Sequence, residues 1–352
     1  MNRIGVGIVG CGNISGIYLK NLTTVFKNVK ILGVCDLNED LAKKASEEYG
    51  VAAAKDKEEL FANPDIQIIL NLTTPQIHFD VCKSALLAGK NVYVEKPVSL
   101  TREDGKALVD LAEEKGLLLG CAPDTFMGGG IQTCKKLIED GWIGKPIAAT
   151  AFMTCHGHES WHPSPEFYYK AGAGPMFDMG PYYLTAMVHM LGAVESVSGE
   201  VRTTFEKRTI TSEPKNGTIM DVDVPTHITG LMNFKSGASG VIITSFDVWG
   251  ANLPFIEIHG TKGSLSVPDP NNFGGTVRIK QSHHGDWHEI PAAFGYTENS
   301  RGIGVSNMAD CLLGSTSELL PNGKLAYHVL DIMHAFHDAA SSGTRSFIQS
   351  EV

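Results

Sequence analysis

Residues 4–16 read IGVGIVGCGNISG, and this stretch decides the fold. Its apolar start is typical of a buried strand, and Gly10 and Gly12 then permit a tight turn into a helix. The backbone of such a turn and the N–H groups of the helix can hold a pyrophosphate. Ser15 stands at the third glycine position of the pattern and is small enough for the helix to pack closely on the strand. Since a glycine turn can also be purely structural, the pattern needs support from the rest of the chain.

The first 123 residues alternate short β-rich apolar runs with amphipathic helical patterns. This alternation predicts βαβ units and a parallel sheet. The predicted strands are 4–9, 30–35, 66–72, 91–94 and 117–121, and one predicted helix, 40–49, begins at Asn38 or Asp40 as its N-cap. We therefore predict an N-terminal α/β domain of the Rossmann type over residues 1–123.

From residue 124 onward the pattern changes to a few helices followed by strands in series. The predicted helices are 131–140 and about 177–191, and the predicted strands are 147–154, 196–205, 226–234, 240–247, 255–259 and 276–281. Pro181 argues that the second helix begins no earlier than about Phe177, because proline is tolerated only in a first turn. Residues 124–352 are thus predicted to form an α+β domain with a large, mainly antiparallel sheet.

Asp36 directly follows the strand 30–35 and lies 20 residues after Gly16. An acid at this separation is expected to accept hydrogen bonds from the adenosine ribose hydroxyls. A 2′-phosphate would meet the carboxylate as a like charge, and no Arg or Lys follows until Lys43. This favours NAD, with NADP less favoured. The alternative is that Asp36 is only a turn or helix-cap residue.

A second charged pair, Glu95 and Lys96, follows the strand 91–94 and precedes Pro97. Ligands of open α/β sheets bind at the carboxyl ends of the strands, where this pair lies. The alternative is an ordinary ion pair at the protein surface.

Four motifs, in this order along the chain, resemble those of the Gfo/Idh/MocA oxidoreductases, which include glucose-fructose oxidoreductase and inositol dehydrogenase. They are TTPQIH at 73–78, EKP at 95–97, GKPI at 144–147 and GTKGSL at 260–265. The resemblance implies that Lys96 is catalytic and touches both the nicotinamide ribose and the reacting hydroxyl, and that the Lys96–Pro97 bond is a candidate cis peptide. An ammonium group there would stabilise a developing alkoxide. The implied cofactor-binding residues are Gly10, Gly12, Asn13, Ile14, Asp36, Thr73, Thr74, Pro75, His78, Glu95 and Lys96.

A glycine-rich stretch at 172–183, GAGPMFDMGPYY, resembles the DxGxH helix start of the same family. Asp178 takes the acid position, but Tyr182 stands where many members carry histidine. The resemblance implies that both are catalytic and bind substrate, and on a helix the two residues share a face. The departure leaves the general base open among Lys96, Asp178 and Tyr182. The alternatives are a helix cap for Asp178 and an ordinary helix position for Tyr182.

The stretch CHGHESWH at 155–162 combines imidazole, thiol and carboxylate groups. Its spacing matches no zinc pattern, so we predict no metal. We expect the stretch to line the substrate pocket, with Trp161 against the C–H face of a sugar and His162 or His158 bonded to hydroxyls. A surface loop is the alternative.

The composition argues against several classes of protein. With 29 Lys and Arg against 39 Asp and Glu, the 352-residue chain has a formal net charge of −10, and it lacks a basic run for nucleic acid. No stretch approaches the roughly 18 apolar residues that would cross a membrane. Seven scattered cysteines without a CxxC pair predict reduced thiols and a cytoplasmic protein. Residues 1–10 lead straight into the glycine loop and are expected to be a first strand, not a leader.

Together these features predict an NAD-dependent dehydrogenase that transfers a hydride between nicotinamide and a ring hydroxyl of a sugar, sugar derivative or cyclitol. Two alternatives use the same residues: an NAD-retaining enzyme that cleaves glycosides by transient oxidation and elimination, and a non-catalytic sugar/NAD sensor. The resemblance further implies that the domain 124–352 binds the substrate and forms the contacts of a homodimer or homotetramer.

Overall fold

The computed structural model describes residues 3–352 and divides into two compact units. Residues 1 and 2 of the predicted first domain lie outside this description. Unit 1 comprises the chain up to Met127 together with Asn299–Leu330, and unit 2 comprises Gly128–Glu298 together with Asp331–Val352. None of the helices in the described part of the chain has the length and apolar character needed to cross a bilayer.

Unit 1 is built on a five-stranded parallel sheet, as predicted. Its strands are β1 (Ile4–Val9), β2 (Val29–Cys35), β3 (Ile66–Asn71), β4 (Asn91–Val94) and β5 (Leu119–Cys121), in the order β2-β1-β3-β4-β5. An isolated parallel bridge between Val34 and Ala53 adds a short extended segment outside β2. The order reverses between β1 and β3, and ligands of such sheets bind at this switch point.

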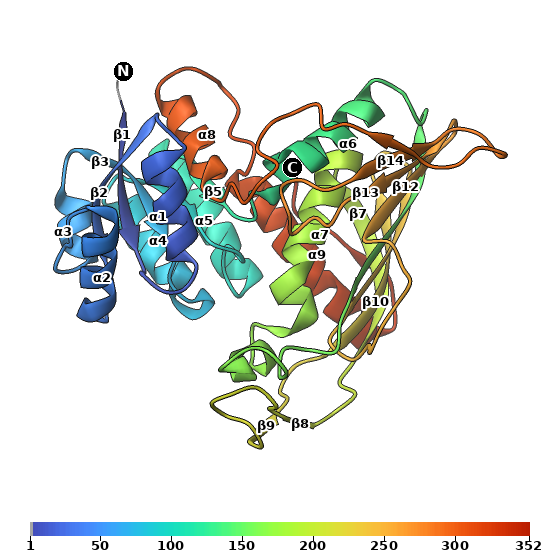
Figure 1. Ribbon diagram of the computed structural model, residues 1–352, viewed down its shortest axis with the longest axis horizontal. Helices are drawn as coiled ribbons and strands as arrows, with labels where there is room; N and C mark the ends of the chain where they lie inside the picture. The colour runs from blue at the N-terminus through green and yellow to red at the C-terminus, as the bar shows by residue number, and fades with distance from the viewer. Residues whose placement is uncertain (1–2) are drawn as a thin grey trace. The chain divides into compact units, whose positions relative to one another are not determined.

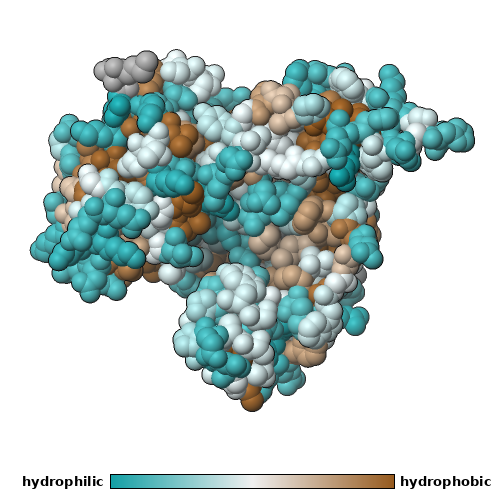
Figure 2. Space-filling model, viewed as in Figure 1, coloured by the Kyte–Doolittle hydropathy of each residue, from teal (hydrophilic) through white to brown (hydrophobic). Residues whose placement is uncertain are grey.

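The helices of unit 1 begin and end at the residues that local chemistry favours. They are α1 (Ser15–Thr24), α2 (Glu39–Tyr49), α3 (Lys57–Ala62), α4 (His78–Leu87), α5 (Arg102–Lys115), α8 (Ile303–Leu312) and the first part of α9 (Gly323–Ser342), with 3₁₀ turns η1 (Pro75–Ile77) and η2 (Thr125–Met127). The predicted cap Asn38 accepts a hydrogen bond from the N–H of Asp40 at the start of α2. Since α2 buries only Ala42 and Ala45, its outer face is charged, and the surface in this region is largely hydrophilic (Figure 2).

The return of residues 299–330 to unit 1 differs from the predicted continuous domain 124–352. Asn322 forms a bridge with Gly120 beside β5, and the side chain of Asn21 donates to the carbonyl oxygens of Asn299 and Arg301. In sequence, Asn21 of α1 is more than 200 residues away from Asn299 and Arg301. Local sequence patterns indicate where a helix forms but not which edge of a sheet it covers. The packing of residues 299–330 in unit 1 therefore could not be predicted from the sequence.

Unit 2 contains a nine-stranded sheet covered by helices on one face (Figure 1). Its strands are β6 (Pro146–Thr154), β7 (Val194–Arg202), β10 (His227–Phe234), β11 (Ser239–Ser245), β12 (Ile256–Gly260), β13 (Ser264–Val267), β14 (Val277–Lys280), β15 (His288–Ile290) and β16 (Ser346–Phe347), in the order β15-β14-β13-β12-β6-β11-β10-β7-β16. The β6–β11 pair is parallel and the other pairs are antiparallel, which confirms the predicted mainly antiparallel sheet. A small two-stranded sheet joins β8 (Lys207–Thr209) and β9 (Ile219–Asp221).

Two helices of unit 2 pack directly on this sheet. Helix α6 (Gly129–Glu139) contacts β13 and β14, and α7 (Gly174–Leu191) contacts β6, β10 and β11. A further 3₁₀ turn, η3 (Pro165–Tyr169), precedes α7. In α9, the ring of Phe336 lies over the cross-strand glycines Gly199 and Gly230, where an added Cβ at Gly230 would come within 2.2 Å of it.

Helix α7 begins at Gly174, so the predicted start near Phe177 is wrong. Pro175 occupies the first turn, whereas Pro181 lies inside the helix and leaves the carbonyl of Phe177 without its usual helical donor. An internal proline costs about 3 kcal/mol. All but three of the eighteen residues are buried, including Tyr182 and Thr185 of the predicted polar face, and this apolar packing offsets the cost.

Candidate active site

The carboxyl ends of three strands in unit 1 lie side by side. Val9 of β1 pairs with Asn71 of β3, and Asn71 pairs with Val94 of β4. The glycine loop, the loop that begins at Thr73 and the Glu95-Lys96 pair follow these positions directly. The structure therefore brings three of the predicted segments to one edge of the sheet.

The glycine loop has a shape that suits a pyrophosphate. Gly10 has a φ of +101°, and a Cβ there would lie 2.7 Å from the carbonyl carbon and oxygen of Leu72. A Cβ at Gly12 would meet no atom within 4 Å, so the loop is open on that side. Ser15 Oγ donates to the Gly12 carbonyl at 2.7 Å and closes the turn where a third glycine is usual. Asn13 and Ile14 then lead into α1, whose first turn carries no acidic residue that would repel a phosphate.

Asp36 is half-buried beside this loop. Its Oδ2 accepts from the N–H of Cys11 at 2.7 Å, and its Oδ1 accepts from the N–H of Asn38 at 2.8 Å. Each carboxylate oxygen has a second lone pair, so the group can still accept a hydroxyl hydrogen. Asp36 thus accepts hydrogen bonds from the backbone of the adjacent turns, as the alternative prediction of a turn or helix-cap residue expects. It also keeps the capacity to accept hydrogen bonds from a ribose.

Asn71, which was not among the residues predicted from sequence, organises the loop that begins at Thr73. This fully buried side chain accepts from the N–H and the Oγ1 of Thr73, at 3.2 and 2.6 Å, and donates to the His78 carbonyl at 3.2 Å. An amide at the end of the apolar strand IQIILN was the available signal. Its contacts hold Thr73 half-exposed and Thr74 exposed at the sheet edge.

His78 lies behind this loop and has no exposed surface. Its Nδ1 is 2.8 Å from the carbonyl oxygen of Pro97 and its Nε2 is 3.0 Å from that of Thr73, while burial lowers its pKa. The side chain of His78 thus lies behind the loop, and its predicted role at the cofactor stays a prediction. His78 connects the Thr73 loop to the segment after Lys96, whose Lys96–Pro97 peptide bond is cis.

Glu95 is held in place from two sides. Its Oε1 accepts from the buried Tyr18 hydroxyl at 2.8 Å, and its Oε2 accepts from the backbone N–H of Lys96 at 3.0 Å. Burial, and then the negative charge of Glu95, raise the pKa of Tyr18 well above its usual range, so the hydroxyl stays a donor. These contacts set the backbone direction at Lys96, whose residue is half-exposed at the end of β4.

The predicted substrate residues of unit 2 gather near Asp178 on α7. Asp178 is half-exposed and Tyr182, four residues on, is buried. His158 Nε2 lies 3.5 Å from Asp178 Oδ2. His162 instead accepts from the N–H of Ser164 at 3.0 Å. Of the two histidines proposed from sequence, His158 is thus the one beside Asp178.

Trp161 lies in the same segment and is 60% exposed. Its ring centroid is 5.3 Å from that of His158 and 5.4 Å from that of His162. An exposed indole next to a polar pair can offer its face to the C–H groups of a sugar.

Models of known families match both parts of the chain. The oxidoreductase family with an NAD-binding Rossmann fold matches residues 4–122, and the GFO/IDH/MocA C-terminal domain matches residues 131–266. This chain is a GFO/IDH/MocA oxidoreductase. The predicted family is therefore confirmed.

Relatives with known names are similar over most of this oxidoreductase. Myo-inositol 2-dehydrogenase of Thermotoga maritima is 26% identical over 80% of this chain and 79% of its own length. The scyllo-inositol 2-dehydrogenase (NAD(+)) of Bacillus subtilis is 27% identical over 76% of this chain and 74% of its own length.

Solved structures share the fold across nearly the whole chain. Levoglucosan dehydrogenase in complex with NADH and levoglucosan has a TM-score of 0.83 at 21% identity, covering 99% of this chain and 100% of that one. A putative NADPH-dependent oxidoreductase from Desulfitobacterium hafniense also has a TM-score of 0.83, at 18% identity, with 99% of this chain and 98% of that chain covered.

The 155–162 segment of the oxidoreductase forms aromatic contacts. The ring of His156 stacks on that of Trp249 with centroids 3.4 Å apart. Between residues 3 and 352, no three His, Cys, Asp or Glu side chains are grouped so that they could hold a metal ion. All seven cysteines are free thiols.

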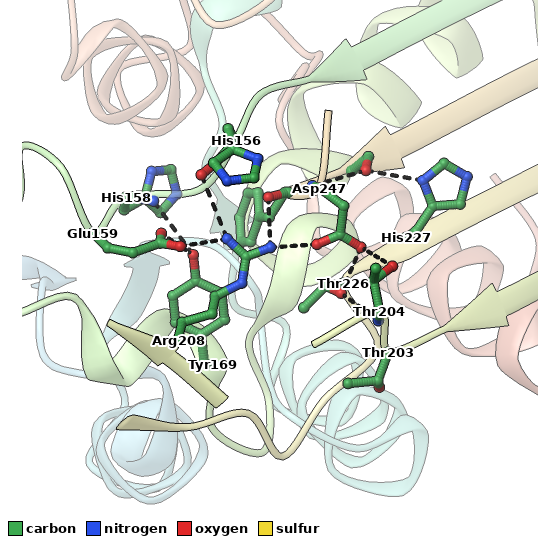
Figure 3. A network of polar contacts seen from close by, with 12 residues as sticks. His156, His158, Glu159, Tyr169, Thr203, Thr204, Arg208, Thr226, His227 and Asp247 are labelled. Atoms are coloured by element: carbon green, nitrogen blue, oxygen red, sulfur yellow. Dashed lines mark hydrogen bonds and ion pairs between the residues drawn. The ribbon is translucent and has the colours of Figure 1, made fainter. Parts of the chain in front are cut away.

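A buried cation, Arg208, anchors the same segment (Figure 3). Its guanidinium binds the carboxylates of Glu159 and Asp247 and donates to the Phe246 carbonyl at 2.8 Å. The Tyr169 hydroxyl donates to the second oxygen of Glu159. Burial opposes ionisation of Glu159, but hydrogen bonds from Tyr169 and Arg208 keep its pKa below the usual value. No local sequence pattern predicts this network, because its partners are up to 52 residues apart.

A buried carboxylate, Asp124, lies near the start of α8 in unit 1. It accepts from the N–H groups of Gly302 and Gly304 at 2.9 and 3.2 Å. Burial raises the pKa of Asp124 from 3.8 to about 6, which the two hydrogen bonds only partly oppose.

This raised pKa predicts a pH-dependent loss of stability. The unfolded chain releases the proton near the ordinary pKa, whereas the folded protein keeps it to about pH 6, so the folded state binds more protons between about pH 4 and pH 6. Stability therefore falls as pH rises through this window, and a shift of this size corresponds to about 3 kcal/mol. Asp124→Asn keeps an oxygen acceptor but does not titrate. We expect urea denaturation to show the wild-type advantage over this variant shrinking between pH 4 and pH 6; a difference that does not change with pH would contradict the assignment.

Proposed function

We propose that this oxidoreductase is NAD-dependent and oxidises a ring hydroxyl of a sugar, sugar derivative or cyclitol. The observation that carries the proposal is the placement of the Glu95-Lys96 pair at the same sheet edge as the open glycine loop. The names of the inositol dehydrogenase relatives support the substrate class.

The residues present fit the adenosine and pyrophosphate parts of the cofactor. A Cβ at Gly10 would collide with the Leu72 backbone, a Cβ at Gly12 would enter the open space where a pyrophosphate fits, and Asp36 keeps lone pairs for the ribose hydroxyls. Asn13, Ile14, Thr73, Thr74 and Pro75 complete the proposed contacts. When bound, NAD accepts the hydride that leaves the carbinol carbon.

We assign the hydroxyl chemistry to Lys96, with substrate contacts from Asp178, Tyr182, Trp161 and His162 in unit 2. The Lys96 ammonium stabilises the negative charge that develops on the carbinol oxygen as the hydride departs. Asp178 and Tyr182 are the other two groups that can take up the proton. We also propose that the protein forms a homodimer or homotetramer, which sedimentation equilibrium would measure.

The test is an assay of the purified protein with NAD and a panel of myo-inositol, scyllo-inositol, levoglucosan, glucose and aryl glycosides. The proposal expects net NADH formation, followed by absorbance at 340 nm, with at least one polyol or sugar. Release of the aryl group without net NADH formation would contradict the proposed dehydrogenase activity and would indicate a redox-neutral glycoside-cleaving activity. Binding of a polyol without either reaction would indicate a sensor.

The proposed preference for NAD predicts the effect of Asp36→Asn. Replacing the carboxylate weakens charge-assisted hydrogen bonds to the ribose, each contributing about 1.5–3 kcal/mol, and removes the repulsion of a 2′-phosphate. We expect kcat/KM for NAD to fall about 10- to 100-fold and the ratio of NADP to NAD efficiency to rise. Asp40→Asn, at an exposed acid in the first turn of α2, is the control. Equal losses with both cofactors would rule out a role of Asp36 in choosing between them.

A further inference from the structure

His158 is a buried imidazole with no hydrogen-bond partner for either ring nitrogen among residues 3–352. The residue is only 8% exposed and lies among aromatic rings, with centroids 4.0 Å from Tyr168 and 4.6 Å from Phe246. Its Nε2 is 3.5 Å from Asp178 Oδ2, which is close enough for electrostatic attraction and too long for a good hydrogen bond. A buried polar atom left in this state costs free energy unless a ligand satisfies it.

The backbone at His158 is held firmly by the Arg208 network (Figure 3). The N–H of His158 donates to the Tyr169 hydroxyl at 3.3 Å, and the same hydroxyl donates to Glu159. Arg208 binds the other oxygen of Glu159 and donates to the His156 carbonyl at 3.4 Å. The main-chain oxygen of Glu159 accepts from the N–H groups of Thr211 and Ser212, both at 2.9 Å. The position of the His158 backbone is therefore set by a buried, charged framework.

We propose that His158 Nε2 and Asp178 Oδ2 form a donor–acceptor pair that recognises one hydroxyl of the substrate, and that Arg208, Glu159 and Tyr169 are positioning residues for this pair. The inference rests on the proposed function and specifies how its substrate is selected. The two side chains keep 10% and 17% of their surface exposed, whereas His158 Nε2 itself is buried, so a small rotation of the imidazole accompanies binding of the ligand group.

The chemistry of the pair selects a hydroxyl. A carboxylate only accepts hydrogen bonds, so the Nε2 that faces Asp178 carries a proton. Nε2–H donates to the hydroxyl oxygen, and the hydroxyl donates its own hydrogen to Asp178. A hydroxyl oxygen about 2.8 Å from each atom makes both bonds. A deoxy position makes neither bond, and a keto or methoxy oxygen can only accept.

The test pairs a protein change with a substrate change. The probe is whichever of myo-inositol, scyllo-inositol and levoglucosan gives the highest kcat/KM, together with its mono-deoxy derivatives. In the wild type, one deoxy derivative is expected to lose about 10- to 100-fold in kcat/KM. His158→Phe keeps the aromatic packing and removes both nitrogens, so it should lower kcat/KM for the parent polyol by a similar factor. The same deoxy derivative should then lose less than about threefold in the variant, because the two deletions remove one interaction.

The positioning residues are tested with Tyr169→Phe, which retains the ring beside Arg208 and removes only the hydroxyl between Glu159 and His158. We expect KM for the polyol to rise about 3- to 10-fold, the size of one lost hydrogen bond, while KM for NAD stays within twofold. Tyr169→Phe tests whether the network positions His158 even if variants at Arg208 do not fold. His288→Phe, at an exposed histidine of β15, is the matched control and should change neither constant.

The outcomes separate this inference from the proposed function. If the wild type forms no NADH with any polyol, the proposed function fails and the inference fails with it. If the wild type is active but His158→Phe keeps the full deoxy penalty at every ring position, the inference alone is overturned. Equal rises in both KM values for Tyr169→Phe would show that the Arg208 network does not position the pair.

Discussion

Replacing Lys96 with alanine is expected to lower kcat/KM at least about 1,000-fold while leaving the protein folded. Removal of a group that stabilises developing oxyanion charge typically costs about 100- to 1,000-fold, and loss of general acid–base catalysis about 100- to 10,000-fold. The structure explains why the fold should survive, since the contact of Lys96 with Glu95 uses the backbone N–H, which alanine retains. Steady-state kinetics with NAD, and circular dichroism of the variant, measure the two parts of the prediction.

Two further lysine variants sharpen this test. Lys96→Arg keeps a positive charge but cannot give up its proton near neutral pH, so a rate close to that of Lys96→Ala would indicate proton transfer by the lysine. Lys106→Ala removes an exposed lysine of α5 that pairs with Asp110, and should leave kcat/KM unchanged. Near wild-type rates for Lys96→Ala would instead assign the proton to Asp178 or Tyr182, or remove the catalytic proposal altogether.

The second large effect is expected on stability, from Arg208→Met. The guanidinium is almost completely buried and neutralises both Glu159 and Asp247, which also accepts from the hydroxyls of Thr204 and Thr226. Removing one partner of a buried ionic network leaves the remaining charges without compensation and costs about 3–5 kcal/mol. Urea denaturation should show a lower midpoint for this variant, with most of the loss in unit 2.

Unit 2 supplies a control of the same chemistry at the surface. Arg278→Met breaks the exposed pair with Glu289 between β14 and β15, which should cost less than about 1 kcal/mol. Adding Glu159→Gln and Asp247→Asn to Arg208→Met removes the stranded charges and is expected to restore part of the stability. Equal costs for the two arginine variants would show that burial of the Arg208 network contributes nothing.

The sequence patterns located most of the secondary structure because the relevant forces there are local. The strands 4–9 and 91–94 were predicted to the residue, since each is an apolar run that ends at a glycine turn or a charge pair. Helix α2 was predicted to within one residue from its periodicity and its Asn38 cap. The start of α7 was wrong because a local rule about Pro181 took no account of the burial that offsets it.

In the candidate site, too, some residues could be predicted from local sequence, whereas the positions of others depend on tertiary contacts. Gly10, Asp36 and Lys96 could be selected from sequence because each follows a predicted strand at a position that topology places at the ligand-binding edge. The position of His78 could not be predicted, since nothing in TTPQIH shows that its ring lies between two backbone carbonyls. His158 and His162 were indistinguishable in sequence, four residues apart in one loop.

The amino-acid sequence by itself determined the family, the two kinds of sheet and the residues at the carboxyl ends of the strands, because periodicity, turn chemistry and motif order are properties of short segments. Only the tertiary structure decided that residues 299–330 return to unit 1, that Arg208 unites Glu159 with Asp247, and that His158 lies beside Asp178. These contacts join residues 20 to 280 positions apart. Their free energy comes from burial and charge pairing in the assembled units, which no local pattern encodes.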